Sequence, residues 1–236
     1  MKIQVKVDVF PLKNTFTISR GSRNQAEVLT VSIHENGIIG YGECVPYARY
    51  NETIESVSKQ IKSIKFINRL DLQKVLPPGA ARNALDCALW DLEAKKNKTT
   101  AYQIAKLKKP LPVLTAYTLS LDDPIKMGKQ AKINSFRHLL KIKLGGGNLD
   151  FERIKEVKNN APNSSIIVDA NEGWTIDEYQ FMAPKLLSLG VKMVEQPLPS
   201  VNDEALLGVK RTLPVCADES CHDRKSLDKC LGKYDV

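Results

Sequence analysis

The sequence contains no apolar stretch that approaches the roughly 18 residues of a membrane-spanning helix. Residues 2–9 alternate apolar and polar side chains, which is typical of a β-strand and unlike the apolar core of a signal peptide. The five cysteines are odd in number and form no CxxC pair. We therefore expect reduced thiols and a cytoplasmic protein that has no membrane partner.

Aromatic residues are scarce, at 6% of the chain, and they are not interleaved with the basic residues. Lys and Arg number 35 against 27 Asp and Glu, which gives a net charge of +8 and raises the question of nucleic-acid binding. Single-stranded nucleic acid is bound by basic grooves that also offer aromatic stacking platforms. The scattered lysines here indicate a solvated basic surface, so we expect no nucleic-acid partner.

Residues 1–45 predict an antiparallel meander with strands near residues 3–10, 27–34 and 38–43. The last two strands are joined by Asn36-Gly37, a strong hairpin signal. Helices are then predicted near residues 53–68, 71–75, 80–96 and 100–106. Pro110 and Pro112 mark the expected domain boundary.

From residue 111 the pattern changes to alternating strands and helices. Short apolar runs end at Thr118, Lys143, Asp169, Glu195 and Asp218, with steps of 23 to 26 residues. A strand and a returning helix need about this length, so five β/α units are predicted. Their helices are expected near residues 123–134, 149–159, 175–189, 202–211 and 224–231.

Three successive runs end in an acid, at Asp169, Glu195 and Asp218. In a parallel barrel the carboxyl ends of all strands face one mouth, where chemistry is built. One such acid could simply cap the following helix or hold a loop. Three together would repel one another, and a divalent cation relieves that repulsion. Hard oxygen ligands suit Mg²⁺, so we predict a magnesium site.

Two lysines precede these acids on the strand that ends Lys141-Ile142-Lys143. Side chains alternate along a strand, so Lys141 and Lys143 face the same side and are predicted to point towards the carboxylates. Lysines facing inwards are costly unless paired or functional. An ammonium near other cations has a depressed pKa and becomes a usable general base. The alternative is a pair of solvated lysines on an exposed strand face.

Seven motifs together resemble those of the enolase superfamily. They are Gly21-Ser22-Arg23, Gly42-Glu43-Cys44, residues 81–92, Lys141-Ile142-Lys143, Asp169-Ala170-Asn171, Glu195-Gln196-Pro197 and Asp218-Glu219-Ser220. The chain is most similar to the muconate-lactonising subgroup and, in it, to dipeptide epimerases of the L-Ala-D/L-Glu type. The resemblance implies an α+β N-terminal capping domain, residues 1–110, and then an incomplete (β/α) TIM-type barrel, residues 111–236, with about five of eight β/α units.

The resemblance also assigns roles to these residues. Asp169, Glu195 and Asp218 would hold Mg²⁺, which would bind the terminal carboxylate of a dipeptide and stabilise the enediolate formed on loss of the α-proton. Lys143 would be the base on one face of the α-carbon. Lys141 would support the developing negative charge.

Two further residues are expected at the substrate. Thr118 would line its site, and Arg23, on a loop of the capping domain, would bind the side-chain carboxylate of the glutamate residue. A salt bridge from Arg23 to an exposed acid is the alternative. The family's second lysine, which works on the opposite face of the α-carbon, belongs to a sixth strand that would lie beyond Val236.

Three functions remain open at this point. The first is a dipeptide epimerase, an isomerase used in recycling peptidoglycan peptides. The second is o-succinylbenzoate synthase or another acid racemase of the subgroup. The third is a non-catalytic, truncated remnant that lacks the second base. The edge of a five-stranded sheet predicts poor stability of the chain alone, a homo-oligomer, or a complementing C-terminal fragment.

Overall fold

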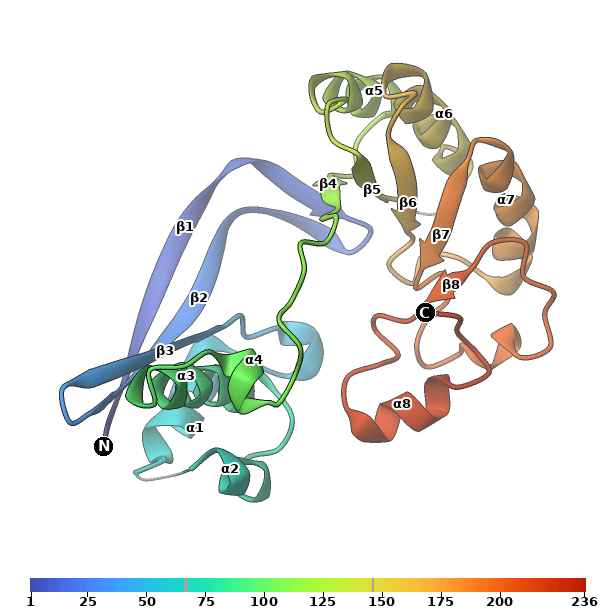
Figure 1. Ribbon diagram of the computed structural model, residues 1–236. Coiled ribbons are helices and arrows are strands. Elements are labelled where there is room, and N and C mark those ends of the chain that lie inside the picture. Colours follow the sequence, from blue (N-terminus) through green and yellow to red (C-terminus); the bar gives the residue numbers. More distant parts are fainter. Residues whose placement is uncertain (66–67, 146) are drawn as a thin grey trace. The chain divides into compact units, whose positions relative to one another are not determined.

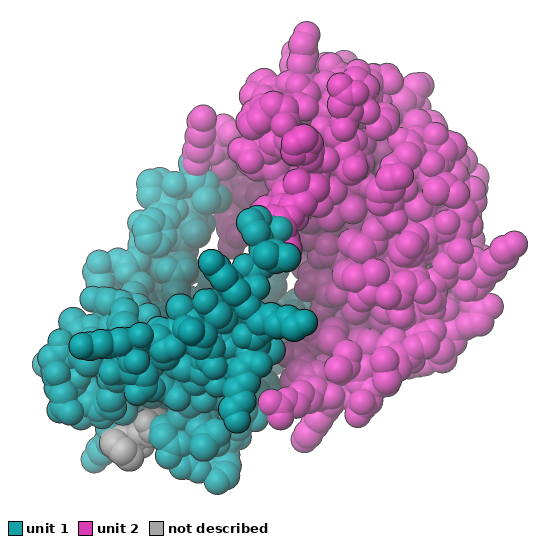
Figure 2. All heavy atoms as spheres, viewed as in Figure 1, with its two compact units in different colours: residues 1–12, 25–112 teal, residues 13–24, 113–236 magenta. Residues whose placement is uncertain are grey.

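The computed structural model describes residues 1–65, 68–145 and 147–236. Two compact units are distinguished in Figure 2: residues 1–12 with 25–112, and residues 13–24 with 113–236. The tip of the first hairpin, residues 13–24, is thus grouped with the second unit. A functional domain boundary at residue 110 stays a prediction. In the described ranges, no helix combines the length and the apolar character that crossing a membrane requires.

The first sheet has the strand order β1-β2-β3. Its strands are β1 (Lys2–Ile18), β2 (Gly21–Glu35) and β3 (Ile38–Cys44), and the first two are longer than the sequence pattern predicted. β2 and β3 pair antiparallel, from Leu29 opposite Cys44 to Glu35 opposite Ile38. The turn between them has Asn36 at φ 50° and Gly37 at φ 78°, which confirms the hairpin signal.

Four helices and one 3-10 turn follow β3. They are η1 (Ala48–Tyr50), α1 (Ile54–Ser63), α2 (Arg69–Val75), α3 (Ala80–Lys96) and α4 (Ala101–Ile104). α3 has the predicted bounds. α1 ends before residue 68 because Ile64 is already extended, with φ −83° and ψ 113°. Residues 66 and 67 of the predicted helix lie outside the described residues.

The second unit contains a five-stranded sheet in the order β4-β5-β6-β7-β8, and every adjacent pair is parallel. The strands are β4 (Tyr117–Leu119), β5 (Leu139–Lys143), β6 (Ser165–Asp169), β7 (Val191–Glu195) and β8 (Val215–Cys216). The helices are α5 (Pro124–Ile133), α6 (Asp150–Asn160), α7 (Ile176–Ser188) and α8 (Arg224–Cys230). Figure 1 shows α5, α6 and α7 along one face of this sheet. The predicted fold class, an α+β segment followed by a partial barrel, is confirmed.

Burial of apolar side chains holds the second sheet against its helices. Leu140 and Ile142 of β5 and Ile166 and Val168 of β6 are fully buried in one cluster with residues of α5, α6 and α7. Burial of a Leu or Ile side chain contributes about 1.5–3 kcal/mol to the stability of the fold, so these contacts hold the strands against the helices. Their carboxyl ends therefore offer a rigid base for side chains.

The helix predicted at residues 202–211 is wrong. The structure has only the 3-10 helix η2 (Glu204–Leu206), followed by an extended Leu207 and by Gly208 at φ 73°. Asp203 could have capped a helix here, but its carboxylate makes no cap bond and accepts from Lys233 and Ser220 instead. The last strand is also shorter than predicted, because β8 ends at Cys216 and not at Asp218.

β3 lies directly against α3 at two glycines. A Cβ atom at Gly42 would lie 2.1 Å from Ala84 O, and one at Gly40 would lie 2.3 Å from Ala88 O. Backbone cannot yield as a flexible side chain can, so we expect Gly42→Ala to lower the free energy of unfolding by about 1–3 kcal/mol. Urea denaturation measures this change.

Gly128→Ala in α5 is the matched control for Gly42→Ala. A Cβ atom there would meet mainly the side-chain ends of Asn160 and Glu156, at 2.9 and 3.2 Å. Both side chains can move, and alanine is favoured over glycine inside a helix by about 1 kcal/mol. Equal destabilisation by the two substitutions would contradict the close packing of β3 on α3.

Candidate active site

The strand register brings three charged side chains into one row. Lys143 pairs with Asp169 across β5 and β6, and Asp169 pairs with Glu195 across β6 and β7. Glu195 pairs in turn with Cys216, two residues before Asp218. Carboxylate oxygens of Asp169, Glu195 and Asp218 all lie within 4.8 Å of one another. The three predicted acids are therefore brought together at the carboxyl ends of neighbouring strands.

Both predicted lysines contact this acidic cluster. The ammonium of Lys141 lies 2.6 Å from Glu195 Oε1 and 3.0 Å from Asp169 Oδ2. The ammonium of Lys143 lies 2.5 Å from the same Asp169 oxygen. Thr118 of β4 is opposite Lys141 in the sheet register and is half-buried. Residues from four successive strands thus meet at one place.

The charges in this cluster are unevenly balanced. Burial and the charge of Asp169 raise the pKa of Glu195 to about 7, against the hydrogen bond from Lys141. Burial also acts to raise the pKa of Asp169, but the ammonium groups of Lys143 and Lys141 outweigh it and the pKa lies below its usual value. Burial would lower the pKa of Lys141, but the two carboxylates raise it overall. The depressed pKa expected of a lysine among cations is therefore not found at Lys141.

These residues fit a magnesium ion. Three carboxylate oxygens within 4.8 Å form the hard oxygen set that Mg²⁺ prefers. The hydrogen bond from Lys141 does not offset the burial of Glu195 and the charge of Asp169, so the pKa of Glu195 stays raised, and a cation would stabilise its ionised form. Among the described residues, the buried oxygens Asn171 Oδ1 and Glu219 Oε2 accept no hydrogen bond. Buried acceptors are rarely left without a donor or a cation, and these two residues follow Asp169 and Asp218 by two residues and one residue in the chain.

The turns that leave β6 and β7 have unusual backbone conformations. Asn171, Glu172 and Gln196 have φ values of 45°, 65° and 33°, in the left-handed region that side chains other than glycine seldom adopt. Backbone hydrogen bonds hold these turns to each other, from Ala170 N to Glu195 O at 3.1 Å and from Glu172 N to Gln196 O at 2.8 Å. Such strain persists where surrounding structure fixes it and is concentrated at functional sites.

The hairpin tip, which belongs to the same unit, adds an arginine beside these turns. Arg20 donates to the carbonyl oxygen of Asn171 at 3.0 Å and pairs with Glu172 at 3.2 Å and with Glu219 at 2.7 Å. Sequence reasoning missed Arg20, because no local pattern reveals a contact that spans about 150 residues of chain. It included Gln196 in the motif Glu195-Gln196-Pro197 but gave this residue no role.

The predicted loop position of Arg23 is wrong, because the residue lies on strand β2; its side chain is exposed. Its guanidinium carbon lies 5.4 Å from the centre of the Phe16 ring, within the same hairpin. This is the range of a cation–π contact. The predicted contact of Arg23 with a substrate carboxylate stays a prediction.

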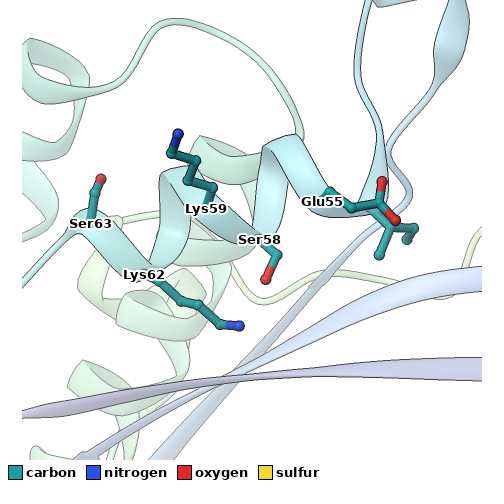
Figure 3. A pocket seen from close by; sticks show the side chains of 6 residues that line it. Glu55, Ser58, Lys59, Lys62 and Ser63 are labelled. Carbon is teal, nitrogen blue, oxygen red and sulfur yellow. The ribbon is translucent and has the colours of Figure 1, made fainter.

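A separate hollow of about 600 Å³ runs along α1, as Figure 3 shows, and is lined by Ile54, Glu55, Ser58, Lys59, Lys62 and Ser63. Among the described residues, its lining comes from one face of this helix alone, without side chains from an opposing element. Binding sites are usually concave and have a few convergent polar groups. We therefore place the candidate site at the acidic cluster and not on α1.

Known proteins match the chain over nearly its whole length. The N-terminal domain of mandelate racemase and muconate lactonizing enzyme matches residues 2–105, and the enolase C-terminal domain-like family matches residues 126–234. L-Ala-D/L-Glu epimerase of Escherichia coli K12 is 42% identical over 99% of this chain, which spans 75% of that protein's length. N-acetyl-D-glutamate racemase of a Pseudoalteromonas species is 38% identical over 89% of this chain and 68% of its own length.

A solved structure is also similar to this chain. An enolase family member from Agrobacterium tumefaciens with homology to dipeptide epimerases, bound to sodium and L-Ala-L-Glu, superposes with a TM-score of 0.94 at 41% identity. The match covers 99% of this chain and 73% of that one. Sequence motifs, fold and relatives agree, and the chain belongs to the enolase superfamily and, within its muconate-lactonising subgroup, to the dipeptide epimerases.

Proposed function

We propose that this chain is a Mg²⁺-dependent epimerase of L-Ala-D/L-Glu-type dipeptides that acts by removing the α-proton. The observation that carries the proposal is the row of Lys143, Asp169 and Glu195, with Lys141 and Asp218 beside it. This arrangement can hold a cation at the substrate carboxylate and a base beside the neighbouring α-carbon. The names of the relatives support the dipeptide as substrate. We also propose a cytoplasmic role in recycling peptidoglycan peptides, a role that this substrate class supports.

Asp169, Glu195 and Asp218 would hold the ion. When bound, Mg²⁺ supplies a Lewis acid for the substrate carboxylate, which is worth several kcal/mol of charge stabilisation. Lys143 takes the α-proton. An amine accepts a proton only when neutral, so its contact with Asp169 at 2.5 Å must weaken before this step. The ammonium of Lys141, which lies beside Glu195 and Asp169, stabilises the negative charge that develops.

Two residues complete the proposed substrate site. Thr118, opposite Lys141 in the register, lines the position of the dipeptide. Arg23, exposed on the hairpin, binds the side-chain carboxylate of the glutamate residue. An arginine fork matches a carboxylate in two parallel hydrogen bonds, which would favour glutamate over apolar residues.

Binding of Mg²⁺ tests the site independently of turnover. Asp218→Asn removes one anionic ligand, and we expect the affinity measured by calorimetry to fall by about tenfold or more, since ligand charge sets affinity for hard cations. Asp228→Asn, an exposed acid on α8, makes the same change of charge and should bind as the wild type does. Equal binding by all three proteins would refute the metal site.

The N-acetyl-D-glutamate racemase relative favours a second candidate, a racemase of an N-acylated acidic amino acid. o-Succinylbenzoate synthase is a further alternative in the subgroup. Comparing the rates of product formation from L-Ala-L-Glu, N-acetylglutamate and the o-succinylbenzoate precursor separates these reactions. We also propose that a homo-oligomer or a complementing C-terminal fragment extends the sheet beyond β8, where the backbone of Asp235 and Val236 already bonds to Val215 and Ala217.

A further inference from the structure

Asp218 is the one exposed member of the acidic cluster, whereas Asp169 is fully buried. Packing around its side chain therefore cannot fix where its carboxylate lies. Its backbone is fixed instead. Asp218 N donates to Gln196 Oε1 at 2.9 Å, and Asp218 O accepts from Cys221 N at 3.0 Å. The position of this ligand thus depends on a side chain from the turn after β7.

Gln196 is itself rigidly held. Its side chain is fully buried, and its backbone has the strained φ of 33°. Its Oε1 accepts a second bond, from Ser220 N at 3.1 Å. Its Nε2 lies 2.9 Å from Leu198 O, 2.9 Å from Ser220 Oγ and 2.8 Å from the Tyr234 hydroxyl. The amide therefore connects the turns after β7 and β8 with the C-terminal segment.

The number of available protons decides which groups in this network donate and which accept. The hydroxyls of Ser220 and Tyr234 both donate to Asp203 Oδ2, at 2.7 and 2.8 Å, and Lys233 donates to Asp203 Oδ1 at 2.6 Å. Burial raises the pKa of Tyr234, so the phenol keeps its proton. With each single hydroxyl proton used on Asp203, both oxygens are left as acceptors. Gln196 Nε2 shares its two protons among these hydroxyl oxygens and Leu198 O, and its Oε1 is therefore aimed at Asp218 N.

We propose that Asp203, Tyr234 and Ser220 are positioning residues that act through Gln196 to set the place of Asp218, and so the affinity of the cation site. The inference rests on the proposed function, because it presumes that Asp218 is a metal ligand. It assigns a role in cation binding to residues that lie outside the acidic cluster. Polar groups that orient metal ligands commonly change metal affinity by about 10–100-fold when removed.

Calorimetric titration with Mg²⁺ alone tests the proposal on three variants. Tyr234→Phe removes one hydroxyl from the network, and Gln196→Met removes every hydrogen bond of the amide at nearly constant volume. Tyr179→Phe is the control, since its phenol belongs to the same unit and is fully buried but donates to Leu213 O, at 3.0 Å, outside the network. We expect about tenfold weaker binding in Tyr234→Phe, a larger loss in Gln196→Met and none in Tyr179→Phe.

Melting temperature separates positioning from general damage. Both Tyr→Phe variants should melt at similarly lowered temperatures, and only Tyr234→Phe should lose Mg²⁺ affinity. If folded Tyr234→Phe binds Mg²⁺ as the wild type does, or if Tyr179→Phe loses as much affinity, the positioning role is overturned while the metal site stands. If wild type and Asp218→Asn bind alike, the metal site fails and the positioning role fails with it. Should Gln196→Met not fold, Tyr234→Phe alone decides.

Discussion

Replacement of Lys143 by alanine should abolish exchange of the dipeptide α-proton with solvent, lowering its rate by about 10²–10⁴-fold. Lys143 is the lysine that is buried beside the cluster, with its ammonium 2.5 Å from Asp169. A base acts only from a fixed position within reach of the proton, and no solvent base has that position. NMR in D₂O, with L-Ala-L-Glu and L-Ala-D-Glu supplied separately, measures the exchange.

Two variants make this test specific. Lys143→Arg keeps a positive charge beside Asp169 but cannot give up its proton near neutral pH, so it should be as inactive as Lys143→Ala. Lys192→Ala changes an exposed lysine on β7 and should exchange at the wild-type rate. Retained exchange in Lys143→Arg would show that charge at this position matters and that base catalysis does not.

The two epimers of the dipeptide, L-Ala-L-Glu and L-Ala-D-Glu, should interconvert at a rate near background when the 236-residue chain is tested by itself. Epimerisation removes a proton from one face of the α-carbon and returns one to the other. Lys143 reaches one face, and the family's second lysine belongs to a strand that would follow β8. Loss of one positioned acid or base lowers a rate by about 10²–10⁴-fold. Chiral chromatography of the product measures the conversion.

The Escherichia coli relative, of which this chain spans 75%, is the positive control for that assay. The relative should convert either epimer to the mixture, whereas the 236-residue chain should leave each configuration unchanged. Conversion by this chain at a rate comparable with the relative's would show that a second acid acts among its residues. Adding a second chain that carries such a lysine on a strand next to β8 should raise the conversion rate.

The acidic cluster could be predicted because each of its members ends an apolar run. Asp169 and Glu195 lie at the ends of β6 and β7, and parallel pairing alone brings them together. The same reasoning placed Lys141 and Lys143 on one side of β5, where both contact Asp169. Strand periodicity is a local signal, and the alternation of strands and helices along the sequence indicates that the strands are parallel.

Contacts between distant segments could not be predicted in this way. The pairing of Arg20 with Glu219 joins the hairpin tip to the turn after β8. The helix expected at residues 202–211 failed for the same reason, since Lys233 and Tyr234 engage the carboxylate of Asp203 from about 30 residues further along. Propensity and capping patterns describe a segment by itself, and here a tertiary contact overrides them.

The environment of the lysines also depends on tertiary contacts. Two neighbouring lysines predict depressed pKa values, but at Lys141 two carboxylates raise the pKa. A cation held by Asp169 and Glu195 would share those oxygens and reduce this effect. The pKa of a lysine in this cluster therefore depends on whether the carboxylates hold an ion.

The most direct test of a cation-dependent base at this cluster is deuterium incorporation from D₂O at the α-carbon of the dipeptide, with and without Mg²⁺. The wild-type chain should place deuterium in one epimer only, in the presence of Mg²⁺, and Lys143→Ala and Asp218→Asn should each remove the signal. Exchange that continues without Mg²⁺, or that survives in Lys143→Ala, would contradict the assignment of this site.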